Sequence, residues 1–400
     1  MDFKPVKIAL IGSGAISYTY INTLTSEFKI VDFVGCSDLI PERSKARAET
    51  FGIRQMTNDE ILNDPEIEIV LNTTELRNHT KVTKMILEAG KNAYSEKALG
   101  DDYAGALANV ELAKSKGLRL GSAPDIYFGA SYQTARKLID DGWIGDPVVA
   151  RAWCIRHYAS YESPNAQGSD SPWGAKGSTI TYDMAGYYVN ALVTLLGPVA
   201  KVAGYSRFYD KHTYSNPLHP DYGQPVKQLT GATTMMGCLE FESGVYGDLV
   251  LCSEGYGPEI PRVEIIGTKG MLTLSDPNNF GGCWDNFIYL NRVGNEGSYK
   301  MPFTHAYADK DPTLPTKSGK PEPCHNGHRG IAVADMAWAI RRNRPHRSSA
   351  ELALHTVEIV SAIEECLGNG AIYTTLSRPA RPAPLKDGLF GAAAESSLDT

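Results

Sequence analysis

The chain has 400 residues, more than one hydrophobic core usually holds, so we expect two domains. Its hydrophobic content of 42% and charged content of 21% are those of a soluble globular protein, and a net charge of −7 gives no reason to expect nucleic acid or an anionic membrane as a partner. We find no signal peptide core and no apolar run long enough to span a bilayer. Seven scattered cysteines, an odd number, then indicate reduced thiols and a cytoplasmic location.

The stretch 7–17, KIALIGSGAIS, is an apolar strand that runs into a glycine turn and then into a helix. Gly12 permits the tight turn, and Gly14 lacks a Cβ, so a pyrophosphate can approach the amides that open the helix. A second apolar strand, 30–38, ends in Asp38 at about the offset of a ribose-binding carboxylate, roughly 20 residues on. The pattern predicts dinucleotide contacts from these residues: Gly12, Ser13, Gly14, Ala15, Ile16 and Asp38. The alternative is a glycine turn in another α/β domain, with Asp38 as a helix cap.

Asp38 also bears on the choice of cofactor. A carboxylate at this position accepts hydrogen bonds from both ribose hydroxyls and repels a 2′-phosphate. Leu39 follows it, where proteins that use NADP often carry arginine or serine. We therefore expect NAD.

Strands and helices alternate as far as residue 121, which predicts right-handed crossovers and a parallel sheet. Ligands of such sheets bind at the carboxyl ends of the strands. The loops expected to converge there are 12–17, 38–40, 73–79 and 95–99.

The pattern changes near Pro124. From 201 to 291 short strands follow one another through turns that suit hairpins, as in an antiparallel sheet. The segment 294–327, rich in proline and glycine, indicates a surface loop or lid, and the tail either reaches another part of the molecule or is loose. We expect an α/β N-terminal Rossmann domain and an α+β C-terminal domain with a large open, mainly antiparallel sheet. The predicted boundaries are 1–124, 125–378 and, for the tail, 379–400.

Three segments resemble one known family. AGKNAYSEKAL at 89–99 is similar to the A-G-K-x-V-x-x-E-K-P segment of the Gfo/Idh/MocA oxidoreductases, and DMAGYYVN at 183–190 is similar to their D-x-G-x-H/Y-x-x-D helix. Residues 121–145 resemble the start of that family's second domain. The chain departs from the family pattern at three positions, with Ala98 in place of proline, Tyr187 in place of histidine and Asn190 in place of aspartate. The first replacement removes the proline that often makes the peptide bond of that turn cis.

The resemblance implies an NAD-dependent oxidoreductase that moves hydride between nicotinamide and a hydroxyl carbon of a sugar, cyclitol or glycoside. In having a tyrosine at position 187, the chain resembles one branch of the family, whose members act on sugars and diols. Beyond the glycine turn, the implied cofactor contacts are Asn72, Thr73, His79, Glu96 and Lys97. His79 alternatively caps its helix. The family's open sheet is commonly buried between subunits, which implies a homodimer or homotetramer.

Oxidation of an alcohol requires a base for the hydroxyl proton, and Tyr187 is the candidate. A free phenol has a pKa of about 10, so a nearby ammonium is needed to favour phenolate, and Lys97 at a strand end can supply it. Asp183 and Asn190 lie at helical spacing from Tyr187, so all three are expected to line one wall. The predicted catalytic residues are Lys97, Tyr187 and Asp183. Alternatively, Lys97 is a solvated lysine, or Tyr187 is core and a neighbouring tyrosine acts instead: Tyr182 or Tyr188.

Substrate contacts are expected from both domains: Lys97, Asp125, Tyr158, Trp173, Asp183, Tyr187 and His325. The run 324–328, CHNGH, could alternatively ligate a metal, but no partner pair has matching spacing, so we expect none and place His325 or His328 at the substrate mouth or in a plain loop. The basic run 341–347 follows a helix, where cations complement the macrodipole. It is interpreted as a solvated face, or alternatively as a site for an anionic substrate group.

Two further functions would use the same site. A redox glycosidase with permanently bound NAD would oxidise C3, eliminate the aglycone, add water and reduce the ketone again. Both this and a dehydrogenase need the same hydride geometry, so the sequence does not separate them. A non-catalytic sugar or nucleotide sensor would keep the fold alone, and the presence of both Lys97 and Tyr187 argues against it.

Overall fold

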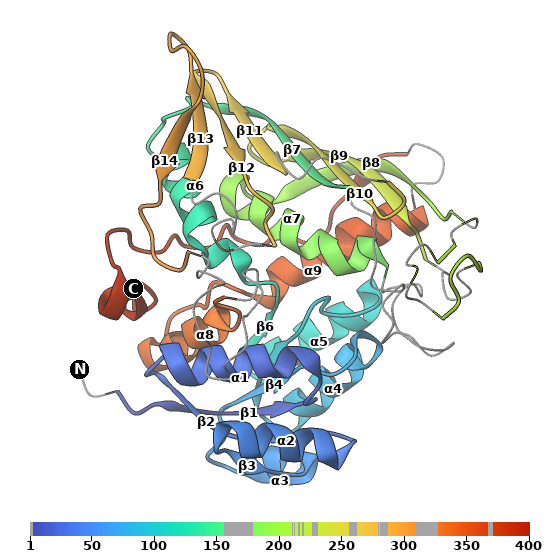
Figure 1. Cartoon of the computed structure of the whole chain (residues 1–400), viewed down its shortest axis with the longest axis vertical. Coiled ribbons are helices and arrows are strands. Elements are labelled where there is room, and N and C mark those ends of the chain that lie inside the picture. Colours follow the sequence, from blue (N-terminus) through green and yellow to red (C-terminus); the bar gives the residue numbers. More distant parts are fainter. Residues whose placement is uncertain are drawn as a thin grey trace.

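The computed structural model contains two β-sheets that lie at opposite ends of the molecule, with helices between them (Figure 1). The N-terminal sheet is built by the blue and cyan part of the chain, and the other sheet mainly by the green to orange part, with one short red strand at its edge. The residues that the structure describes are 3–155, 179–209, 211, 213–214, 217, 220–225, 231–255, 262–278, 280, 287–308, 327–366 and 371–400.

The N-terminal sheet has six parallel strands in the order β3-β2-β1-β4-β5-β6. Its strands are β1 (Val6–Ile11), β2 (Val31–Ser37), β3 (Arg54–Gln55), β4 (Ile69–Asn72), β5 (Asn92–Ser95) and β6 (Leu120–Ser122). The helices that connect them are α1 (Ala15–Glu27), α2 (Pro41–Phe51), α3 (Asn58–Asn63), α4 (His79–Glu88) and α5 (Tyr103–Ser115). The chain moves outward from β1 to β3 and then returns to β4, so the order reverses between β1 and β4. Ligands of parallel sheets bind at such a switch point, outside the carboxyl ends of the strands.

The second sheet has nine strands in the order β14-β13-β12-β11-β7-β10-β9-β8-β15. Its strands are β7 (Pro147–Ile155), β8 (Val199–Arg207), β9 (Thr234–Phe241), β10 (Tyr246–Cys252), β11 (Val263–Gly267), β12 (Gly270–Leu274), β13 (Phe287–Arg292), β14 (Tyr299–Pro302) and β15 (Tyr373–Thr374). Among the described strands of this second sheet, only β7 and β10 pair in parallel. The predicted fold class is confirmed. The prediction of a loop over 294–327 is wrong for β14, whose residues pair with β13 at the edge of the sheet.

Four helices fill the space between the sheets: α6 (Ala130–Asp140), α7 (Ile180–Leu196), α8 (Ile331–Arg342) and α9 (Ala350–Ser361). Every residue of α7 is buried, because this helix packs on strands β7, β9 and β10 and also contacts α6 and α9. Helix α9 contacts α5 and β6 as well, and α8 contacts α1 and β6. Helices α8 and α9 therefore connect the second half of the chain to the first sheet. The domain boundaries 1–124 and 125–378 stay a prediction. None of the described helices combines the length and apolarity needed to cross a bilayer.

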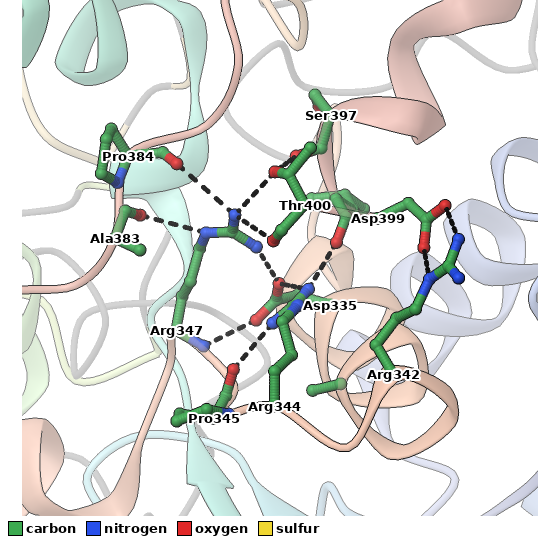
Figure 2. A network of polar contacts seen from close by, with 12 residues as sticks. Asp335, Arg342, Arg344, Pro345, Arg347, Ala383, Pro384, Ser397, Asp399 and Thr400 are labelled. Carbon is green, nitrogen blue, oxygen red and sulfur yellow. Dashed lines mark hydrogen bonds and ion pairs between the residues drawn. The ribbon is translucent and has the colours of Figure 1, made fainter.

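The basic run 341–347 and the tail form an internal network (Figure 2). Asp335 is fully buried and accepts from Arg344 at 2.8 Å and from the Arg347 guanidinium at 2.5 Å. Arg347 also donates to the carbonyl oxygen of Thr400 at 2.9 Å. Glu395 accepts from two backbone amides at the turn before β2. The interpretation of the basic run as a solvated face is therefore wrong, because its arginines hold the C-terminal tail. The tail reaches another part of the molecule, as one of the two alternatives for it predicted.

Candidate active site

The glycine turn after β1 is shaped by close backbone contact. Gly12 has φ +104°, and a Cβ there would lie 2.6 Å from the amide nitrogen of Thr74. Gly14 precedes α1 without a side-chain cap, and a Cβ there would meet nothing within 4 Å. The space beside Gly14 is thus open, and the first amides of a helix have no partner within the helix, which suits a bound pyrophosphate. These features fit NAD at the predicted place.

Asp38 follows β2 and connects the glycine turn to the next loop. Its Oδ2 accepts from the Ser13 amide at 2.6 Å, and its Oδ1 accepts from the Ile40 amide at 2.8 Å. Each carboxylate oxygen has a second lone pair that can accept from a ribose hydroxyl. Asp38 is therefore fixed in position beside the turn while keeping acceptor capacity for the cofactor.

The loop after β4 is built by buried polar side chains. Asn72 donates to the carbonyl oxygen of His79 at 3.0 Å, and the hydroxyl of Thr73 donates to the carbonyl oxygen of Gly12 at 2.7 Å. The ring nitrogens of His79 lie 2.8 and 3.0 Å from the carbonyl oxygens of Ala98 and Thr74. Burial lowers the pKa of His79, with the backbone hydrogen bonds opposing it. These side chains hold the loop together, and their contacts to NAD stay a prediction.

Lys97 and Asp183 form an ion pair that joins the two halves of the chain. Their side chains are only 15% and 8% exposed, so the solvated-lysine interpretation is wrong. Burial opposes the charge on Lys97, but the attractions of Asp183, Tyr187 and Glu96 together outweigh it, so the pKa of Lys97 lies above its usual range. The Lys97–Ala98 peptide bond is cis although alanine replaces proline.

Tyr187 lies one helical turn after Asp183, beside Lys97. The Lys97 Nζ atom is 5.6 Å from the centroid of the Tyr187 ring. The neighbouring tyrosines are directed elsewhere: the Tyr182 hydroxyl lies 3.0 Å from Ser361 Oγ, and the Tyr188 hydroxyl donates to Asp276 at 3.2 Å. Of the three candidates, the structure therefore brings Tyr187 to the lysine.

Two predicted acidic residues are buried beneath this cluster. Glu96 accepts from the Tyr20 hydroxyl at 2.7 Å and from the Lys97 amide at 2.9 Å. Asp125 is fully buried and accepts from the Gly330 amide at 2.8 Å at the start of α8. Burial raises the pKa of Asp125 to about 6, against the opposing charge of a nearby arginine and the backbone hydrogen bonds. The two carboxylates thus hold neighbouring elements in place, and a direct contact from Asp125 to substrate stays a prediction.

Several other predictions have a different outcome. The Asn190 side chain is buried and accepts from Thr356 of α9 at 3.0 Å, and its expected place on the same wall as Tyr187 stays a prediction. His328 lies between Glu27 of α1 and a backbone carbonyl. Within the described part of the chain, no cluster of three potential metal ligands occurs. Three predicted residues lie outside the described residues: Tyr158, Trp173 and His325.

The sequence interpretation missed Arg329 and Asn278. The Nη1 of Arg329 donates to the Tyr187 hydroxyl oxygen at 3.0 Å, and its Nη2 donates to Asn278 Oδ1 at 2.7 Å. Neither residue belongs to a motif, and 142 residues separate Arg329 from Tyr187 along the chain. Only the three-dimensional fold brings Arg329 and Asn278 to Tyr187.

Comparison with known proteins places this site in context. A family model described as an oxidoreductase family with an NAD-binding Rossmann fold matches residues 6–123, and one described as the GFO/IDH/MocA C-terminal domain matches residues 132–273. The chain is 27% identical over 274 residues to the scyllo-inositol 2-dehydrogenase (NAD(+)) of Bacillus subtilis, covering 67% of this chain and 73% of that enzyme. Two further relatives are covered over only 52% and 44% of their lengths.

Solved structures show the same fold over nearly the whole chain. A levoglucosan dehydrogenase in complex with NADH and levoglucosan has a TM-score of 0.74 at 19% identity, covering 94% of this chain and all of that one. An oxidoreductase from Agrobacterium radiobacter in complex with NAD+, L-tartaric acid and magnesium has a TM-score of 0.71 at 18% identity, covering 93% of this chain and 98% of that one. These likenesses confirm the predicted fold, and the family model described as an NAD-binding Rossmann fold confirms the predicted NAD cofactor.

Proposed function

We propose, since this chain belongs to the Gfo/Idh/MocA family of oxidoreductases, that it oxidises a secondary hydroxyl of a sugar or cyclitol. The observation that carries the proposal is the buried Lys97–Asp183 pair beside Tyr187, at the carboxyl end of β5. When bound, NAD supplies the acceptor for the hydride that leaves the carbinol carbon. The chain's own residues then have to bind the alcohol, remove its proton and exclude water.

Tyr187 is the proposed base. Its phenolate would accept the proton of the substrate hydroxyl, while the electrons of the broken O–H bond form the carbonyl. Lys97 carries a positive charge at the pH of the reaction and can donate to the substrate oxygen. Asp183 holds Lys97 in place and can accept from a neighbouring hydroxyl of a polyol. This set of donors and acceptors suits a substrate with several adjacent hydroxyl groups.

The proposed substrate class also has support from the relatives. The Bacillus subtilis relative is named for scyllo-inositol, and one structural neighbour was solved with levoglucosan. Both compounds are cyclic and polyhydroxylated. We find nothing that favours the redox-glycosidase or the sensor alternative.

The proposal can be tested on protein purified without added cofactor. The protein is incubated with free sugars, inositols and aryl glycosides, and reduced nicotinamide and released aglycone are recorded together. NADH that appears only with added NAD, without aglycone release, supports the dehydrogenase. Aglycone release without net NADH would favour the glycosidase, and NAD binding without either product across the panel would favour the sensor.

We also propose that the chain assembles into a dimer or tetramer through the nine-stranded sheet. Tyr205, Met236 and Tyr246 are 65%, 55% and 62% exposed, and Tyr205 pairs with Met236 across neighbouring strands. Large exposed apolar side chains on adjacent strands are typical of a surface that another subunit covers. Sedimentation velocity should give a dimer or tetramer, and Met236→Glu should dissociate it. A monomer for the unmodified protein would contradict the proposal.

A further inference from the structure

Arg329 contacts the proposed base although the mechanism above gives it no role. It is 4% exposed, lies directly before α8 and donates to the Tyr187 hydroxyl oxygen at 3.0 Å and to Asn278 Oδ1 at 2.7 Å. A guanidinium is a rigid planar fork, so two such bonds fix its plane and its position together. The phenol oxygen of Tyr187 is thereby held at a defined point, with a lone pair and its O–H left for substrate.

The residues on both sides of Arg329 are anchored to other elements. The His328 Nδ1 atom lies 2.7 Å from the carboxylate of Glu27 at the end of α1. The Gly330 amide donates to the buried carboxylate of Asp125 at 2.8 Å. Three consecutive residues thus contact three separate parts of the molecule, which positions the guanidinium before any substrate binds.

Two cations lie near Tyr187, and they act on it differently. Lys97 is 5.6 Å from the ring centroid, and its charge is offset by the ion pair with Asp183. Arg329 instead donates directly to the oxygen that becomes negative. Coulombic attraction grows as distance falls, and a hydrogen bond to the charged form favours that form. The other titratable groups that act on these two cations are Glu96, Asp125 and Tyr20.

We infer that Arg329 is a positioning residue that stabilises the Tyr187 phenolate, so that Arg329, more than Lys97, determines the pH at which Tyr187 becomes a base. The inference rests on the proposed function, in which the substrate O–H bond breaks, a new O–H bond forms on Tyr187, and hydride leaves the carbinol carbon for bound NAD. Arginine stays protonated throughout the working range, so the stabilisation does not titrate away.

A spectroscopic titration tests the inference without any substrate. Tyrosinate absorbance is followed against pH for the full chain and for Tyr187→Phe, and the difference isolates the ionisation of Tyr187. The same difference is measured between Arg329→Met and Arg329→Met/Tyr187→Phe. We expect the midpoint to move to higher pH by about one unit or more, since a neighbouring opposite charge has an effect of that size. An unchanged midpoint would overturn the inference.

Enzyme kinetics give a second, independent readout, with a substrate identified by the panel of sugars and inositols proposed above. In Arg329→Met the acidic limb of the kcat/KM profile should move to higher pH, with roughly tenfold or more loss near neutrality that recovers in alkali, while NAD affinity stays unchanged. Arg329→Lys keeps the charge but cannot bridge both acceptors, so its shift should be smaller. Arg381→Gln is the matched control, because Arg381 donates to the carbonyls of Thr194 and Leu195 at the far end of α7.

The failure of this inference differs from the failure of the proposed function. If the pH profiles of kcat/KM for Arg329→Met and for the unmodified chain run parallel, Arg329 has only a structural role, whatever the loss of rate. Full activity in Tyr187→Phe would instead remove Tyr187 as the base. If Arg329→Met does not fold, Asn278→Ala frees one side of the guanidinium, and a shift in the same direction is expected. No shift in that variant would count against the inference.

Discussion

The cofactor half and the catalytic half of the site are assembled in different ways. The glycine turn, the start of α1 and Asp38 all lie within residues 12–38, and the Ser13 amide of the turn donates to the Asp38 carboxylate. The catalytic cluster joins Lys97 to Asp183 over 86 residues and Tyr187 to Arg329 over 142. The first arrangement depends on local backbone geometry, whereas the second exists only when α7 and the segment before α8 come together at Lys97. The two halves should therefore respond to different changes.

The largest effect is expected from Tyr187→Phe, which removes the proposed base and leaves the cofactor half intact. General acid–base groups typically contribute about 10²- to 10⁴-fold, so kcat should fall by that factor. NAD affinity, measured by quenching of protein fluorescence, should stay within about twofold. The hydroxyl contacts Arg329 rather than any residue of the glycine turn, which is why the two readouts should separate.

Tyr188→Phe provides the matched control for this experiment. Its hydroxyl donates to Asp276 and points away from Lys97, so the variant loses one buried hydrogen bond and should cost stability of about 1 kcal/mol with little change in kcat. If Tyr188→Phe lost activity and Tyr187→Phe did not, the assignment of the two tyrosines would have to be exchanged.

The contrast between the cofactor half and the catalytic half also explains which parts of the molecule could be predicted from the sequence. The strand, glycine turn, helix and Asp38 follow rules of local geometry, and all appear where expected. The helical spacing of Asp183 and Tyr187 placed both beside Lys97, whereas the partner of Asn190, Thr356 of α9, could not be read from the spacing. Arg329 and Asn278 could not be found, since nothing near them in the sequence records which helix they meet.

The basic run 341–347 shows the same limit. Position after a helix is a local property and suggested a solvated face. The partners that bury it, Asp335 and the tail up to Thr400, depend on how distant segments pack (Figure 2).

Asp335→Asn should produce the largest loss of stability, because the packing of α8 and the tail depends on this carboxylate. Asp335 is fully buried and ion-pairs with Arg344 and Arg347, the latter only 4% exposed in its side chain. Removing one partner of a buried pair leaves uncompensated charge, at a cost of about 3–5 kcal/mol in the free energy of unfolding by urea. Asp399→Asn is the control: its partner Arg342 is 31% exposed, and the loss should be below about 1 kcal/mol. Equal losses in both variants would contradict the burial argument.

His355 should make the stability of the second half depend on pH. Its Nε2 accepts from the Val199 amide at 3.0 Å, which requires the neutral ring, and burial lowers its pKa to about 4. The unfolded chain binds a proton at this histidine below about pH 6.5, whereas the folded chain does so only near pH 4. The free energy of unfolding should therefore fall as pH decreases through this window, by at most about 3 kcal/mol. His355→Gln, measured by urea unfolding at pH 7 and pH 4.5, should show a smaller difference, and an identical difference in both proteins would exclude this histidine as a source.

The smallest effect is expected in the cofactor half, where Asp38→Asn changes charge but keeps an oxygen that can accept from an amide. Asp38 accepts from Ser13 and Ile40 through different oxygens, and asparagine can keep one of these two contacts, so the turn should largely survive, whereas the repulsion of a 2′-phosphate should be lost. The ratio of the Kd values for NADP and NAD, measured by calorimetry, should fall about tenfold, which corresponds to about 1.4 kcal/mol. Asp38→Ala removes both the charge and the two amide contacts, so it should weaken the binding of both cofactors as well as their discrimination. Tighter binding of NADP than NAD by the unmodified chain would show that Asp38 does not select the cofactor. Because Asp38 contacts the Ser13 and Ile40 amides rather than Lys97 or Tyr187, neither variant should move the pH profile of kcat, and a shift would mean that the two halves are coupled.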